Sequence, residues 1–314
     1  MTSSRRLPVA YNTSTYDSAG GKDYSVLATW EAATDNNLVT ATAGEVLDCY
    51  KGAHNDADVL DGATTNASYF RVIRPADGEG HSGIPKSDGS CVCFIGSSSR
   101  LGTYENYSSI HDIVVSISLN TSSNRLAFYT SADADYGSFI GCIAFDCANA
   151  GTGAAIGFYT ADQDPFYIIN CAAFNNKTTG FLIYGVAYIY NSIAYGNSIG
   201  FASSGTQVRK NCILDGNTTD STGTWTTTTC LIGSSPTYVD SANDDFHLAL
   251  GDTTAKDQGT DLSGDGVFAF DDDIDGETRS GTWDIGFDEY VVTAGGTLSI
   301  NVHDCGPDGP AIFV

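Results

Sequence analysis

Three aspartates stand at alternate positions, Asp271, Asp273 and Asp275, and Gly276 follows them. This pattern matches the first half of a calcium-binding loop, in which alternate carboxylates supply oxygen ligands. A complete EF-hand loop would carry a glutamate at its twelfth position, where this chain has Thr282. The segment therefore predicts a calcium site, and the alternative is a carboxylate-capped turn held by a nearby cation.

Pairs of carboxylates indicate a second chemistry, the cleavage of glycosidic bonds. Asp162 and Asp164, like Asp133 and Asp135, would share one face of a strand, because alternate residues of a strand point to the same side. A glycosidase needs two carboxylates about 5–9 Å apart. The chain has 38 acidic residues, so such pairs are also expected in ordinary exposed turns.

The elements that would position these residues come from a short phrase that occurs four times. The copies are Gly141–Phe145, Asn170–Asn176, Asn191–Asn197 and Asn211–Asn217, and their second residues are 29, 21 and 20 positions apart. In each copy, small or apolar side chains alternate with other side chains, as in a half-buried strand. Each copy is flanked by Gly or Asn, which tolerate the left-handed backbone of a corner. A repeat of about twenty residues predicts a β-solenoid.

Stacking of the copies about 4.8 Å apart by parallel hydrogen bonds would align equivalent side chains in columns. An inward column and a neighbouring asparagine column are predicted, in which stacked amides satisfy one another. The alternative is an antiparallel sandwich with chance similarity between the copies. The predicted columns are Cys142, Cys171, Ser192 and Cys212, and Asn170, Asn191 and Asn211.

One helix is predicted near the start of the chain, over Tyr24–Ala32. Leu27 and Trp30 would face inward, and Asp23 or Ser25 would be the N-cap. The helix would cover the open end of the solenoid, because an uncovered terminal turn invites edge pairing.

Three segments follow from the sequence. Residues 1–20 are predicted as a flexible or partner-bound arm, and 21–290 as the solenoid domain. Its regular coils occupy about 125–235, and its irregular, acidic closing segment occupies 236–290. Residues 291–314 are predicted as a C-terminal β-tail.

Composition excludes several classes of function. The net charge of −24, with 14 Lys and Arg in total, argues against binding nucleic acid through phosphates or binding an anionic membrane surface. The nine cysteines show no paired framework, so mostly free, buried thiols are expected. The first twenty residues lack the apolar stretch of a secretion signal, and no window reaches the length of a membrane span.

The end of the chain carries a resemblance to a known family. Asp245–Leu248, Asp271–Arg279 and Trp283–Tyr290 resemble the "FHL … DxDGxxR … DIGxxE" ending of many right-handed parallel β-helices of the pectate-lyase-like superfamily, including bacterial surface proteins and phage virion proteins. The opening Asp23–Glu31 extends this resemblance to about residues 21–290. It implies an all-β, right-handed parallel β-helix with a short N-terminal capping helix and an irregular acidic C-terminal cap. Arg279 would pair with a carboxylate and fix the terminal loop.

The family includes lyases, and for a lyase the resemblance implies a carboxylate cluster beside an Arg or Lys base on one face of the coils. Asp162, Asp164, Lys177 and Arg209 are the candidates that this chain offers. No family motif marks them, and the alternative is that they occupy ordinary exposed corners.

The function expected first is that of a structural bacteriophage virion protein, a capsid decoration, spike or fibre component that acts by assembly and display without catalysis. It would be assembled in the host cytoplasm, associate with itself, with a trimer favoured, and bind other virion proteins. No cofactor is expected beyond the possible calcium. The alternative is an extracellular polysaccharide lyase or glycoside hydrolase that degrades a surface glycan, with the tyrosines Tyr184, Tyr188, Tyr190 and Tyr195 as a sugar platform. A third interpretation is a bacterial surface adhesin.

Overall fold

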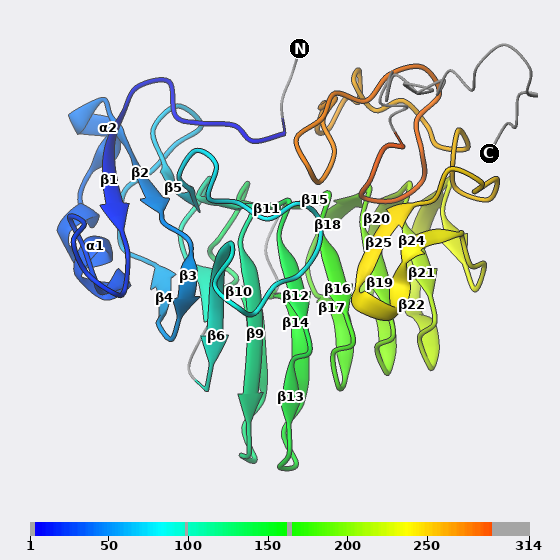
Figure 1. Cartoon of the computed structure of the whole chain (residues 1–314). Coiled ribbons are helices and arrows are strands. Elements are labelled where there is room, and N and C mark those ends of the chain that lie inside the picture. The colour runs from blue at the N-terminus through cyan, green and yellow to red at the C-terminus, as the bar shows by residue number, and fades with distance from the viewer. Residues whose placement is uncertain (1–3, 98–99, 162–164, 291–314) are drawn as a thin grey trace, which may run out of the picture.

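The computed structural model describes residues 4–97, 100–161 and 165–290. Asp162, Asp164 and the predicted β-tail at 291–314 lie outside the described residues. Within the described ranges the protein is all-β, with large parallel sheets and short helices (Figure 1). The longest described helix has eight residues, too few to cross a membrane.

A fourteen-stranded sheet contains two rows of strands that both end on the long strand β20 (Ile199–Lys210), which also pairs with β22 (Thr219–Thr228). The first row consists of β1 (Tyr11–Tyr16), β2 (Gly44–Cys49), β5 (Arg71–Pro75), β8 (Ser109–His111), β11 (Ser138–Ile140), β15 (Phe166–Ile169) and β18 (Ala187–Tyr190). The other row consists of β4 (Ala57–Leu60), β7 (Arg100–Thr103), β10 (Arg125–Thr130), β14 (Ala155–Thr160) and β17 (Thr179–Ile183). We call this other row the third row, because the chain enters it last in each pass.

A nine-stranded sheet supplies the second row. Its strands are β3 (Gly52–His54), β6 (Val92–Gly96), β9 (Val114–Leu119), β12 (Ile143–Phe145), β16 (Ala172–Phe174), β19 (Ile193–Tyr195), β21 (Ile213–Asp215) and β23 (Leu231–Ile232), with β13 (Ala148–Asn149) beside β9. The chain passes through the first, second and third rows in the same order each time, for example β15, β16 and β17. All neighbours in the rows are parallel, and β24 (Tyr238–Asp240) and β25 (Asp245–Leu248) form a separate antiparallel pair around a short 3-10 helix (Ser241–Asn243).

The quasi-repeat sets the register of the second row. Ile143 pairs with Ala172, Ala172 with Ile193, and Ile193 with Ile213, which reproduces the steps of 29, 21 and 20 residues. The residues that precede these four are Cys142, Cys171, Ser192 and Cys212, and all four are fully buried. The Ser192 hydroxyl accepts a hydrogen bond from the Cys171 backbone N–H at 3.1 Å, so this polar member of the column is satisfied.

The interior between the rows contains a ladder of aromatic rings from the third row. Phe158 stacks on Phe128 and on Phe181, with ring centroids 4.8 Å apart in each case, and Phe181 contacts Phe201 at 4.6 Å. The rings come from residues that are partners in the parallel register, so backbone pairing and ring stacking stabilise the same alignment.

The start of the chain corrects the prediction of a flexible or partner-bound arm for residues 4–20. Strand β1 pairs along its whole length with β2 and forms the edge of the first row. Tyr16 at the end of β1 is fully buried in the main core. Sequence reasoning missed this strand because Tyr11–Tyr16 is polar, and its stability comes from pairing with β2 rather than from an apolar period.

The predicted helix exists, with a different start and cap. Helix α1 spans Leu27–Thr34, and a second short helix, α2, spans Leu38–Ala41. Leu27 and Trp30 are buried as expected. Neither Asp23 nor Ser25 caps α1, since the Asp56 carboxylate accepts the Leu27 N–H at 2.8 Å. Figure 1 shows α1 beside β1 and β4, at the N-terminal end of the rows.

The closing segment, residues 236–290, packs along the outside of the rows rather than over their end, which corrects the prediction of a C-terminal cap (Figure 1). One part of it covers outward side chains of the second row, such as Ile143 and Ile193, with Phe246 and Ile285. Another part covers the first row with Leu262, Phe268, Phe270 and Trp283. The strands of these two rows are apolar on both faces, so both faces need cover.

Phe158→Ala is expected to reduce the free energy of unfolding by about 3–5 kcal/mol, because it removes two ring stacks and leaves a cavity in the ladder. Equilibrium urea unfolding followed by circular dichroism measures the change. Val239→Ala, at an exposed position of β24, is the control and should change stability by no more than about 0.5 kcal/mol. Equal losses in the two variants would contradict the ladder as a source of stability.

Candidate functional site

The structure separates the two cations predicted for lyase chemistry. The Lys177 ammonium donates to the backbone carbonyls of Asn149 and Gly151 at an outer corner. Arg209 lies inside the rows, in register with the core residue Ile189, and is 4 % exposed. The prediction that Lys177 and Arg209 share one face is therefore wrong, since alternation along β20 directs Arg209 inward.

Arg209 is held by neutral groups. Its guanidinium donates to the Thr227 hydroxyl at 2.9 Å and to the Ser221 hydroxyl at 3.0 Å, and it lies 4.9 Å from the ring centroid of Trp225. Burial lowers the pKa of Arg209 from its ordinary value. The other two candidates, Asp162 and Asp164, lie outside the described residues, so no carboxylate can be placed beside this cation from them.

The three aspartates of the predicted calcium loop do not converge on one point in the described structure. Asp273 is buried, and its Oδ1 accepts the backbone N–H groups of Asp275 and Glu277. The Asp275 carboxylate turns away to His247, 3.1 Å from Nε2. Asp271 accepts the backbone N–H of Arg279 through its own carbonyl. The segment thus forms a carboxylate-capped turn.

Arg279 holds the end of the closing segment together. Its guanidinium is fully buried, pairs with Glu289 at 3.2 Å, and donates to the carbonyls of Gly286 and Phe287. The carboxylate partner is thus Glu289 and not one of the aspartates at 271–275. Charge-assisted bonds to a single buried guanidinium fix several backbone segments at once.

The asparagine column is the surface on which the closing segment docks. The Asn170 amide donates to the Asp272 carbonyl at 2.9 Å, and the Asn211 amide exchanges hydrogen bonds with the Thr260 backbone. The Asn191 amide lies between the Asn211 amide and the guanidinium of Arg279. The column therefore bonds to the closing segment as well as along its own axis.

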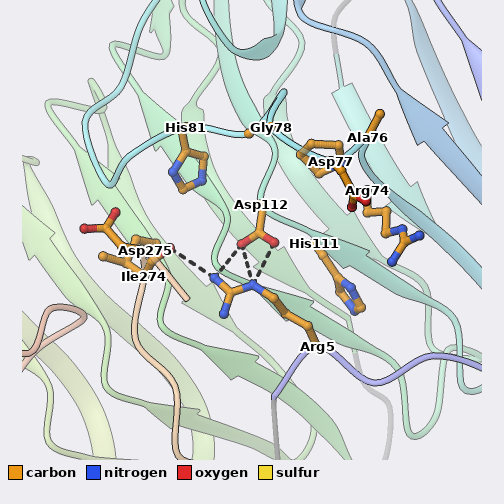
Figure 2. A pocket seen from close by; sticks show the side chains of 12 residues that line it. Arg5, Arg74, Ala76, Asp77, Gly78, His81, His111, Asp112, Ile274 and Asp275 are labelled. Carbon is orange, nitrogen blue, oxygen red and sulfur yellow. Dashed lines mark hydrogen bonds and ion pairs between the residues drawn. The ribbon is translucent and has the colours of Figure 1, made fainter. Parts of the chain in front are cut away.

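A cavity of about 400 Å³ opens where the N-terminal residues, the loop at 74–81 and the closing segment meet. Its floor is the ion pair of Arg5 and Asp112, in which Nε and Nη2 each lie 2.7 Å from a carboxylate oxygen (Figure 2). Arg5 also pairs with Asp272 at 2.9 Å. We call this cavity the Arg5 pocket.

Two histidines flank the ion pair on opposite sides in Figure 2. His81 bonds the Gly141 carbonyl through Nε2 at 2.7 Å, and burial lowers its pKa below the ordinary value. His111 bonds the Ser109 hydroxyl through Nε2 at 2.6 Å, and burial lowers its pKa to about 4. Both imidazoles are therefore neutral at neutral pH.

A second cavity of about 160 Å³ is lined by Ser109, Ser138 and several aromatic rings. Tyr107 and Tyr136 stack at 5.1 Å, and Tyr167 contacts Phe268 at 4.9 Å. Arg6 lies over the Phe268 ring, 4.4 Å from its centroid. We call this cavity the tyrosine pocket.

The tyrosines predicted as a sugar platform do not form one surface. Tyr188 stacks on Tyr167, near the tyrosine pocket, whereas Tyr190 is buried. Tyr184 packs against Tyr159 of the third row, and Tyr195 packs under the closing segment. The residues that do line the pocket, Tyr107, Tyr136 and Tyr167, are 29 and 31 positions apart, close to the longer step of the quasi-repeat. That spacing is the signal that sequence reasoning missed.

Ser109 and His111 give the site one pair with the geometry of a nucleophile and a base. The Ser109 hydroxyl also lies 2.6 Å from the Ser138 hydroxyl, and all three side chains are buried. In the described part of the chain no carboxylate bonds the other ring nitrogen of His111, so the orienting group of a triad is missing. The described structure thus shows a buried serine–histidine hydrogen bond without the third group of a triad.

No family model, no curated protein and no solved structure matches this chain. The resemblance to the pectate-lyase-like superfamily therefore rests on the opening and ending motifs and on the parallel rows of strands.

The buried histidine pair predicts a pH dependence of stability. Unfolding raises the pKa of His111 from about 4 to its ordinary 6.5, so the unfolded chain binds more protons between these values. The stabilisation that depends on neutral His111 should therefore be fully present above pH 6.5 and decline as the pH falls towards 4, and it is on the order of 3 kcal/mol.

Urea unfolding at several pH values measures this decline, and His111→Gln should flatten it. Ser109→Ala keeps the imidazole and should keep the slope. A His111→Gln variant with the original slope would show that another group causes the decline.

Proposed function

We propose that the chain is a right-handed parallel β-helix that serves as a structural virion protein of a bacteriophage, a capsid decoration, spike or fibre component. The constant order of the three rows, their parallel pairing and the steps of 20 to 29 residues support the coiled architecture. Each coil would consist of one strand from each row.

One observation carries the non-catalytic role: the charged groups of the candidate sites are used in structural bonds. Arg5 pairs with Asp112 and Asp272, and Arg74 pairs with Asp48 at 2.7 Å. Lys177 binds backbone carbonyls. Catalytic groups need a charge or proton that is poised for the substrate, whereas these charges stabilise contacts between segments.

Assembly would use the exposed edge at the C-terminal end of the rows. Strand β22 pairs with β20, its other edge has no strand partner among the described residues, and most of its side chains are exposed. An unpaired strand edge is a template for another chain. We propose that this end contacts a neighbouring subunit, with a trimer favoured, or another virion protein, which would place the chain in the virion.

Mass spectrometry of purified virions tests the proposal. The chain should be present at a fixed ratio to the major capsid protein, and light scattering of the isolated protein should give the mass of an oligomer. Absence of the chain from washed particles would overturn the virion role.

A second candidate is a glycan-binding depolymerase that acts outside the cell, and the tyrosine pocket is the observation that favours it. Aromatic faces beside an arginine and hydroxyl groups are the surfaces that sugar rings pack against. The test is incubation with acidic and neutral polysaccharides, followed by unsaturated uronate absorbance and reducing ends.

No release of product is expected from any polysaccharide in this panel. Should release occur, Lys177→Ala and Arg209→Ala would test the lyase prediction, and Ser109→Ala would test the serine–histidine pair. Activity that one of these substitutions abolishes would replace the structural proposal with the enzymatic one.

A further inference from the structure

A histidine and two aspartates of the closing segment meet beside the Arg5 pocket. They are His247 of β25, Asp275 of the capped turn and Asp288 near the end of the described chain. One ring nitrogen and one carboxylate oxygen from each aspartate lie within 4.8 Å of one another. Three separate stretches of sequence therefore present metal-binding atoms to one point.

The imidazole of His247 is held in its orientation by the carboxylate of Asp245. Its Nδ1 lies 2.6 Å from a carboxylate oxygen of Asp245, and its Nε2 faces Asp275 at 3.1 Å. A carboxylate that holds one ring nitrogen directs the other towards a metal ion and raises its basicity. Asp245 would thus serve as the outer partner of the histidine ligand.

Asp288 supplies an independent observation. The residue as a whole is 6 % exposed, and its Oδ2 accepts the Leu248 N–H at 2.8 Å. Its second oxygen has no hydrogen bond in the described structure, and the buried Arg279 reaches only the Asp288 backbone carbonyl. This oxygen is not used by a protein donor and is therefore available to a cation.

The backbone of Gly83 packs closely against the histidine ring. Gly83 lies over the ring with φ of +66°, and a Cβ atom at this position would lie 2.4 Å from Nε2. A side chain at this position would collide with the imidazole, so only glycine allows the loop to approach the histidine this closely.

We propose that His247, Asp275 and Asp288 bind one divalent transition-metal ion of the zinc class, with water completing the coordination. An imidazole nitrogen with two carboxylate oxygens suits zinc and its first-row neighbours, whereas calcium prefers oxygen ligands alone. The ion would join β25, the capped turn and the end of the closing segment, and would stabilise their packing on the rows.

The same side chains also allow a metal-free arrangement, in which a protonated His247 forms ion pairs with Asp245 and Asp275. The two arrangements differ in what binds to the purified protein. They also differ in the effect of removing one aspartate while leaving the histidine in place.

Isothermal titration of the full chain, first stripped with EDTA, tests the site with zinc chloride, and calcium and magnesium chloride are the comparisons. Zinc should bind with a stoichiometry of one and raise the melting temperature, and calcium and magnesium should do neither at the same concentration. Cobalt should give a visible spectrum without thiolate charge-transfer bands, which excludes the cysteines as ligands.

Asp275→Asn is the decisive variant, because its side chain is 30 % exposed and its loss should not prevent folding. Zinc affinity should fall at least about tenfold, and the zinc-dependent rise in melting temperature should disappear. Asp271→Asn, in the same turn but outside the cluster, is the matched control and should bind like the natural protein.

Three results would overturn the proposal: no stoichiometric zinc binding, equal zinc affinity in Asp275→Asn, or thiolate bands in the cobalt spectrum. Binding of calcium that the Asp271→Asn substitution abolishes would also overturn it. Such a result would favour the calcium site predicted at Asp271, Asp273 and Asp275. If the Asp288→Asn variant folds, a loss of zinc affinity in it is a second test of the site. If it does not fold, the zinc affinity of Asp275→Asn alone decides the question.

Discussion

The arrangement of the rows depends on one backbone constraint, a left-handed residue where the chain turns from the first row into the second. Asp112, Gly141, Asn170, Asn191 and Asn211 hold this corner in successive passes, with φ between 48° and 64°. Few residue types tolerate this conformation, so a glycine, asparagine or aspartate recurs at this corner in each of these passes through the rows. The register of the strands, the buried columns and the docking surface for the closing segment all follow from it.

The quasi-repeat allowed the steps of the second row and its buried column to be predicted, since strand, corner residue and spacing lie close together in the sequence. The position of the closing segment was not predictable in this way. Ile143, Ile193 and Ile213 alternate with the inward residues and read as ordinary strand positions. Only the structure shows that their outward side is also buried, and that residues 236–290 therefore lie along the rows.

The candidate sites were harder to predict than the fold because their members are far apart in sequence. Arg5 and Asp272 are separated by 267 positions, and nothing near Arg5 indicates its partner. Asp275 is predicted from its sequence neighbours as a calcium ligand, and no local pattern joins it to His247, 28 positions away. Conversely, Lys177 and Arg209 are near in sequence and yet one lies at an outer corner and the other inside the rows.

The contact between the two ends of the described chain has a kinetic consequence. The Ser4 backbone N–H and the Arg5 guanidinium both bond the Asp272 carboxylate, which forms part of a turn that docks on strands from the middle of the chain. A contact between residues so far apart in sequence is formed only after the entropy cost of bringing the two segments together has been met, so it forms late in folding. We therefore expect the parallel rows to form before the contact of Ser4 and Arg5 with Asp272. During unfolding, this contact should break before the closing segment separates from the rows.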